Sequence, residues 1–151
     1  MTEFYTVTST HETEKLGKEL AKRLESNGLR RAFIAMRGEM GVGKTAFTRG
    51  FASYFDIACV KSPTYTVLNE YRGRAKIHHF DFYRITDGDD LYSIGYDDII
   101  ESDGYCIGEW SENVEDFLPA ERITVTISRI NNGNEADASL RSISIELGDL
   151  L

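Results

Sequence analysis

One eight-residue segment carries the strongest chemical signal in this sequence. It matches the pattern G-x-x-x-x-G-K-[ST] without a mismatch and reads Gly38-Glu39-Met40-Gly41-Val42-Gly43-Lys44-Thr45. Glycines in such a loop let successive backbone N–H groups turn inward around phosphate oxygens. A helix that begins near Lys44 points its positive dipole end at the same anion. We therefore expect a nucleotide site, with Lys44 at the β- and γ-phosphates and the Thr45 hydroxyl on Mg²⁺.

A phosphate-binding loop of this kind needs an acid that holds Mg²⁺, directly or through water, usually at the end of a neighbouring strand. Two acids occupy such positions: Asp81 closes the run 77–81, and Glu109 closes the run 106–109. Either one alone is as readily explained as a strand-end carboxylate that faces water. Spacing by itself does not rank the two.

Three further features of the sequence could contribute to this site or be purely structural. The hydroxyl-rich segment 62–66 could present Thr64 to Mg²⁺ and the γ-phosphate, as switch loops do, or it could be a turn fixed by Pro63. Adjacent His78 and His79 point to opposite faces of a strand, so they do not form a two-histidine metal site, and we expect one packed and one exposed. Trp110 is read as a core or interface residue in preference to a functional one.

The elements that must position these residues follow from the hydrophobic pattern. Strands are expected at 4–7 and 32–36, and the second of these runs into the glycine-rich loop. A helix begins after the capping box at 9–12, carries leucines at helical spacing and stops at 27–28. A second helix begins near Lys44 and carries a phenylalanine stripe along one side: Phe47, Phe51 and Phe55.

The rest of the chain is richer in strands. Segments 66–71 and 76–81 flank Gly73 as a hairpin, a short helical region covers about 89–100, and a strand covers 105–110. Segments 123–127 and 143–147 alternate cleanly and form an antiparallel pair around the turn Asn132-Gly133. The predicted fold is α/β: a P-loop NTPase core with a mostly parallel sheet flanked by helices, plus an antiparallel C-terminal hairpin. We expect a single P-loop ATPase domain over 1–151.

Composition and missing motifs narrow the function. A net charge of -8 over 151 residues argues against strong non-specific binding to nucleic acid. Cys59 and Cys106 belong to no C-x-x-C pair and are read as reduced core residues of a cytoplasmic protein without membrane association. The absence of an N-K-x-D motif disfavours a GTPase. The sequence has neither an arginine-rich lid nor an obvious arginine finger, which favours low intrinsic turnover that a partner completes.

Four motifs in order and spacing give the sequence a resemblance to a known family. The loop at 38–45, Ser62-Pro63-Thr64-Tyr65-Thr66, His79-Phe80-Asp81-Phe82-Tyr83-Arg84 and Glu109-Trp110 together resemble TsaE (also called YjeE). The resemblance spans about 13–110 and continues more loosely to the C-terminus. It implies a Mg²⁺-dependent ATPase of tRNA threonylcarbamoyladenosine biosynthesis that binds the TsaD–TsaB heterodimer in a nucleotide-dependent way and meets tRNA only through that complex.

The resemblance also implies roles for individual residues. Thr45 and Glu109 would be the metal ligands, and Asp81 would act near the γ-phosphate, through the attacking water. Lys44 and Thr64 would complete the catalytic set, and the segment around Thr10 would border the adenine. Nucleotide contacts would come from 38–46, although this chain has Ala46 where family members usually have a second threonine. It also has Gly108 where they usually have a larger apolar residue.

Two other functional classes stay open at this stage. A nucleotide-gated binding module would use ATP and ADP only to select conformations, with negligible hydrolysis. A small-molecule P-loop kinase would transfer the γ-phosphate to a metabolite, although the missing arginine lid counts against it. A protein that binds tRNA directly is disfavoured by the acidic charge.

Overall fold

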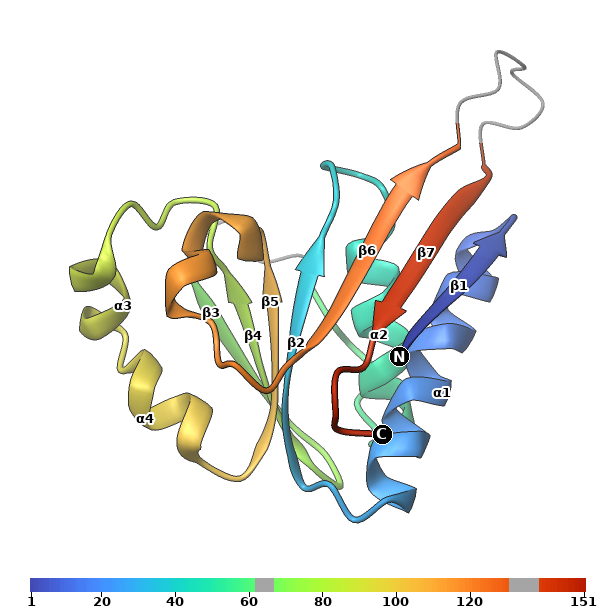
Figure 1. The fold of residues 1–151 in the computed structure, drawn as a ribbon. Helices are drawn as coiled ribbons and strands as arrows, with labels where there is room; N and C mark the ends of the chain where they lie inside the picture. Colours follow the sequence, from blue (N-terminus) through green and yellow to red (C-terminus); the bar gives the residue numbers. More distant parts are fainter. Residues whose placement is uncertain (62–66, 131–138) are drawn as a thin grey trace.

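The computed structural model describes residues 1–61, 67–130 and 139–151, and its core is one seven-stranded sheet (Figure 1). The strand order is β1-β7-β6-β2-β5-β4-β3. In chain order the elements are β1 (Thr2–Val7), α1 (Thr10–Ser26), β2 (Arg31–Arg37), α2 (Lys44–Tyr54), β3 (Leu68–Arg72), β4 (Lys76–Asp81), α3 (Gly88–Ser93), α4 (Tyr96–Glu101), β5 (Gly104–Glu109), the 3₁₀ helix η1 (Ser111–Phe117), β6 (Ile123–Arg129) and β7 (Arg141–Glu146).

The middle of the sheet is parallel and its margins are antiparallel. β2 pairs in parallel with both β5 and β6, and β4 pairs in parallel with β5. The hairpins β3–β4 and β6–β7 are antiparallel, and β1 adds to the outer side of β7. The predicted α/β fold with a C-terminal hairpin is therefore confirmed. Among the described residues, no helix has the length and apolar character needed to cross a membrane.

Alternate residues of β2 feed two separate cores, because successive side chains of a strand point to opposite faces. Ile34 and Met36 pack into the core under α1 and α2, whereas Phe33 and Ala35 pack into the core on the α3–α4 side. Figure 1 shows these two helix pairs on either side of the central strands. Covering both faces explains why β2 is an almost continuous apolar run.

Helix α1 begins and ends where the sequence predicts. The Ser9 hydroxyl accepts a hydrogen bond from the Glu12 backbone N–H at 3.2 Å. The Glu12 carboxylate reaches back to the Thr8 backbone N–H at 2.7 Å, one residue earlier than a capping box requires. Asn27 caps the C-terminus, and Gly28 follows with φ +75°. Such a left-handed residue is the common way to end a helix.

Two glycines let α1 and α2 approach until their backbones touch. A Cβ on Gly17 would lie 2.1 Å from the Phe47 carbonyl oxygen, and one on Gly50 would lie 1.8 Å from the Glu14 carbonyl oxygen. Because neither backbone can move aside cheaply, any larger residue must push the helices apart. This contact therefore fixes the position of α2, whose first residue is Lys44.

We expect Gly50→Ala to lower the free energy of unfolding by about 3 kcal/mol, the upper end of overpacking costs. Urea unfolding of the variant and wild type measures this difference. Ser26→Ala, at an exposed position of α1, is the matched control and should change stability by less than about 0.5 kcal/mol. A Gly50→Ala protein as stable as this control would contradict the close helix contact.

The structure differs from the sequence-based predictions at several positions. Cys106 is buried as expected, but Cys59 is exposed, because in the irregular segment after α2 it is Ile57 and Val60 that turn inward. His78 and His79 are both buried, since β4 lies between two strands with both faces covered. The helical region 89–100 is two short helices, and η1 was not anticipated. The turn at 132–133 is outside the described residues.

Candidate nucleotide-binding site

The loop 38–43 joins the C-terminal end of β2 to the N-terminus of α2, which is the structural context that its sequence predicts. Gly38, Gly41 and Gly43 have φ of +147°, +73° and +123°. Residues with a Cβ rarely adopt such values. The glycines of the motif are therefore required by the backbone path of the loop.

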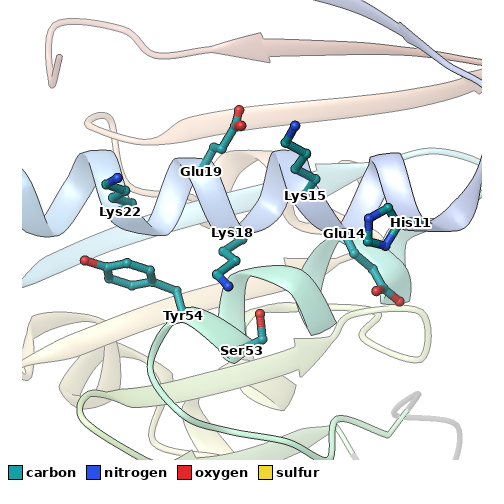
Figure 2. A pocket seen from close by; sticks show the side chains of 8 residues that line it. All are labelled: His11, Glu14, Lys15, Lys18, Glu19, Lys22, Ser53 and Tyr54. Atoms are coloured by element: carbon teal, nitrogen blue, oxygen red, sulfur yellow. The ribbon is translucent and has the colours of Figure 1, made fainter.

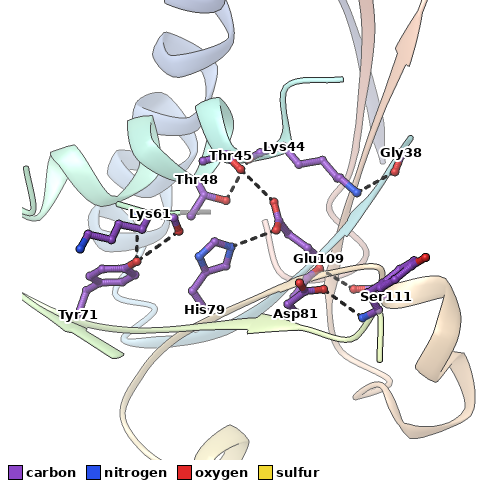
Figure 3. A network of polar contacts seen from close by, with 12 residues as sticks. Gly38, Lys44, Thr45, Thr48, Lys61, Tyr71, His79, Asp81, Glu109 and Ser111 are labelled. Carbon is purple, nitrogen blue, oxygen red and sulfur yellow. Dashed lines mark hydrogen bonds and ion pairs between the residues drawn. The ribbon is translucent and has the colours of Figure 1, made fainter. Parts of the chain in front are cut away.

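A hollow of about 440 Å³ opens beside this loop. It is lined by Met40, Gly41, Gly43, Lys44, Thr45, Asp81, Tyr83, Arg84, Glu109 and Trp110. The carboxyl ends of parallel strands meet at one edge of a sheet, which brings β2, β4 and β5 to this hollow. Four predicted site residues thereby come together from distant parts of the sequence: Lys44, Thr45, Asp81 and Glu109 (Figure 3).

The two candidate acids are direct neighbours but face different partners. Asp81 and Glu109 are paired residues of adjacent strands. The Glu109 Oε1 atom lies 3.4 Å from the Thr45 hydroxyl, which donates a hydrogen bond to it. Asp81 instead accepts a hydrogen bond from the backbone N–H of Tyr83 at 3.0 Å. The geometry therefore pairs Glu109, and not Asp81, with the hydroxyl that is expected to bind the metal.

Burial and charge oppose each other at Glu109 and Lys44. Burial raises the pKa of Glu109 to about 7, with Asp81 adding to the rise and Lys44 and Thr45 opposing it. Burial also lowers the pKa of Lys44, against the attraction of Glu109, Glu112 and Asp81. A buried carboxylate is costly to ionise on its own. It is therefore well suited to bind a metal cation, which supplies the compensating positive charge.

The raised pKa of Glu109 predicts a pH effect on stability. Between pH 4.5 and about 7 the folded protein keeps a proton that the unfolded chain has released, so stability is present at low pH and is lost as the pH rises. In metal-free buffer, wild type should lose about 3 kcal/mol relative to Glu109→Gln between pH 4.5 and 7.5. Urea unfolding at intervals across this range measures the difference. A difference that stays constant with pH would contradict the raised pKa.

His79 lies beneath the site and was not predicted to belong to it. Its side chain is fully buried, neither ring nitrogen has a hydrogen-bond partner within the described residues, and Nε2 lies 3.8 Å from Glu109 Oε2. Burial lowers the pKa of His79 to about 4, so the imidazole is neutral near pH 7. The available signal was its place two residues before Asp81, on the same face of the strand.

Trp110 lines the hollow and also packs, partly buried, against the core on the α3–α4 side. Its backbone has φ +59°, an uncommon value for a residue with a side chain. The Lys44 Nζ atom lies 4.3 Å from the centroid of the indole ring. The Tyr83 ring also packs against the indole, with 5.1 Å between the ring centroids. Lys44 also donates a hydrogen bond to the Gly38 carbonyl oxygen at 2.8 Å. The lysine is thus held by its own loop and by an aromatic face.

The remaining predicted site residues do not line the hollow or are outside the described residues. Thr10 is the exposed first residue of α1 and does not line the hollow. Thr64 lies outside the described residues. Four residues of the predicted nucleotide contacts do not line the hollow either: Gly38, Glu39, Val42 and Ala46.

A metal at this site would depend on oxygens beyond those of the protein. In the described part of the chain, no group of three or more His, Cys, Asp and Glu residues could hold a metal ion. The Thr45 hydroxyl and the Glu109 carboxylate lie within hydrogen-bond distance and would supply two oxygen ligands. This arrangement fits Mg²⁺, which keeps several waters and binds through one or two protein ligands plus phosphate oxygens.

Gly108 makes room for a neighbouring ring. A Cβ at this position would lie 2.4 Å from the Phe82 ring and 3.2 Å from the Ser111 hydroxyl. Phe82 therefore fills the space that a larger side chain would occupy. The Phe82 ring thus compensates for the glycine that replaces a larger apolar residue at 108, and Glu109 still reaches Thr45.

A second hollow shares none of these residues. It lies between α1 and the end of α2, has a volume of about 610 Å³ and is lined by His11, Glu14, Lys15, Lys18, Glu19, Lys22, Ser53 and Tyr54 (Figure 2). Its glycine-free, mixed-charge lining lacks the features of a phosphate loop. The residues of the phosphate-binding loop thus line the first hollow and not the second.

A glycine-rich loop between a buried parallel strand and a helix, with acids at the ends of neighbouring strands, defines a P-loop NTPase fold. A sequence model of the family described as "Threonylcarbamoyl adenosine biosynthesis protein TsaE" matches residues 7–137. The chain therefore belongs to the TsaE family.

Individual relatives agree with this assignment. The chain is 31% identical over 127 residues to the tRNA threonylcarbamoyladenosine biosynthesis protein TsaE of Treponema pallidum, covering 83% of this chain and 91% of that protein. It is 38% identical over 116 residues to the Haemophilus influenzae protein of the same name, covering 75% and 73%. The solved structure of Bacillus subtilis YdiB superposes with a TM-score of 0.74 at 26% identity, covering 98% of this chain and 87% of YdiB.

Proposed function

We propose that this protein binds and slowly hydrolyses ATP in support of tRNA threonylcarbamoyladenosine biosynthesis, through nucleotide-dependent association with the TsaD–TsaB heterodimer. The observation that carries the proposal is the convergence of Lys44, Thr45 and Glu109 beside a phosphate-binding loop, in a chain of the TsaE family. The heterodimer is proposed as the partner because the four sequence motifs resemble those of the TsaE family. tRNA would be reached only through that complex.

The positions of the four predicted residues that line the hollow support a role for each of them. Lys44 would exchange its contacts with Gly38 and Trp110 for the β- and γ-phosphates. Thr45 and Glu109 would hold Mg²⁺, which supplies positive charge to the phosphate oxygens when bound. Asp81, next to Glu109 at the mouth of the hollow, would orient the attacking water. Thr64 would contact the γ-phosphate from the segment 62–66, and the segment around Thr10 would border the adenine.

Slow hydrolysis follows from the small amount of positive charge at the hollow. Among the described residues that line it, Lys44 and Arg84 are the cations, and Arg84 is exposed. Rapid phosphoryl transfer by P-loop proteins usually needs a further arginine at the transferring phosphate. A partner that docks at the hollow could supply or organise that charge.

Phosphate release from Mg²⁺-ATP tests the proposal, measured for the pure protein alone and with the matching TsaD–TsaB heterodimer. We expect slow turnover alone, and a change in turnover or nucleotide affinity when the heterodimer is added. Nucleotide binding with no hydrolysis in either condition would favour a nucleotide-gated binding module. No effect of the heterodimer on either quantity would refute the proposed partner.

A further inference from the structure

The outer side of the phosphate-binding loop is held by two arginines of the C-terminal hairpin. Arg129, at the end of β6, lies with Nη1 3.0 Å from Glu39 Oε2, and its Nη2 donates a hydrogen bond to the Met40 carbonyl oxygen at 3.3 Å. Arg141, at the start of β7, donates from Nε to the Val42 carbonyl oxygen at 3.1 Å. Two carbonyl oxygens and one carboxylate of the loop are thus bonded to the neighbouring hairpin.

These contacts match what an anion-binding loop requires. When successive N–H groups turn inward toward an anion, the carbonyl oxygens of the same peptide units turn outward. An outward carbonyl that lacks a donor loses the free energy of a hydrogen bond or must bind water. Charged donors at Met40 and Val42 therefore favour the loop shape in which the N–H groups face the hollow.

The placement of the two arginines opposite each other is unfavourable in itself. Arg129 and Arg141 are direct cross-strand partners in the antiparallel ladder. Like charges at such positions repel each other and destabilise a hairpin. The repulsion is eased because the two side chains reach different residues of the loop.

The same hairpin also supports the start of the loop. A Cβ on Gly38 would lie 2.5 Å from the Ile127 carbonyl oxygen of β6. The first residue of the loop therefore rests on the β6 backbone, and its later residues are bonded to Arg129 and Arg141. The hairpin forms a continuous support from one end of the loop to the other.

We propose that Arg129 and Arg141 are positioning residues that hold the phosphate-binding loop in its anion-binding shape, which makes the C-terminal hairpin part of the nucleotide site. This inference rests on the proposed nucleotide binding. Neither arginine needs to touch the nucleotide. Arg129 lies within the residues matched by the family model, whereas Arg141 lies beyond them.

The test compares Arg129→Met, Arg141→Met and Arg141→Lys with wild type, using Mg²⁺-ATP and Mg²⁺-ADP as ligands in calorimetric titrations. Each methionine variant should raise both dissociation constants about tenfold, the effect of losing one charge-assisted hydrogen bond. Turnover at saturating ATP should stay within about twofold, because the ligand reshapes the loop once bound. Arg141→Lys keeps a charged donor and should recover most of the affinity. Arg72→Met, at an exposed arginine of β3, is the control and should bind as wild type does.

Amide hydrogen exchange of residues 39–43 without nucleotide gives an independent readout. Faster exchange of these amides in both methionine variants is expected, and unchanged exchange would overturn the inference. Lower melting temperatures with unchanged dissociation constants would also overturn it, because they would show a purely structural role for the arginines. If wild type itself bound neither nucleotide, the proposed function would fail, and the exchange data would still decide whether the arginines hold the loop.

Discussion

Lys44→Ala is expected to weaken binding of both ATP and ADP by at least about 100-fold, or about 3 kcal/mol. The lysine is the one buried cation among the described residues that line the hollow. Its amine is already positioned at the loop by the Gly38 carbonyl and the Trp110 ring. Removing it leaves the phosphates with backbone donors alone. Calorimetric titration with each nucleotide measures the loss.

The fold of this variant should stay intact. Burial lowers the pKa of Lys44, which means that keeping the amine charged at this position costs stability. The melting temperature of Lys44→Ala without nucleotide should therefore equal or exceed that of wild type. Lys61→Ala, at an exposed lysine, is the matched control and should bind nucleotide normally. Unchanged nucleotide affinity and hydrolysis in Lys44→Ala would refute the site.

Glu109→Ala is expected to reduce Mg²⁺-dependent hydrolysis by about 100-fold or more, the usual scale for losing a preorganised charge contact at a reacting phosphate. The Glu109 carboxylate meets the Thr45 hydroxyl from the adjacent strand end, and both are oxygen ligands of the kind that Mg²⁺ prefers. The concentration of Mg²⁺ needed for half-maximal activity should rise together with the loss of rate.

Asp81→Ala provides the comparison. Its carboxylate holds the Tyr83 backbone and does not meet Thr45 within the described contacts, so this variant should lose turnover while keeping nearly the wild-type Mg²⁺ requirement. Titration of activity with Mg²⁺ for both variants separates the two roles. If Asp81→Ala abolished the Mg²⁺ response and Glu109→Ala did not, the metal assignment would be reversed.

The local parts of this protein could be predicted from the sequence because their signals are local. The loop 38–43 needs glycines at its left-handed positions, and the strand before it and the helix after it have distinct hydrophobic periods. The same holds for the Ser9 cap of α1 and for the alternation of Ile123, Val125 and Ile127. Each pattern depends on residues within one or two turns of one another.

Tertiary structure alone decided how these parts meet. The residues gave no basis for preferring Glu109 to Asp81, because the choice depends on which carboxylate faces Thr45 once β4 and β5 are paired. The burial of both His78 and His79 likewise depends on the strands and helices that cover β4.

The bracing of the loop by Arg129 and Arg141 arises in the same way, from residues about 90 and 100 positions away in the sequence. No local sequence pattern links residues so far apart, because they meet only when the strands of the sheet have paired. The sequence by itself therefore determined the phosphate-binding loop and its elements. The sheet order determined which side chains surround that loop.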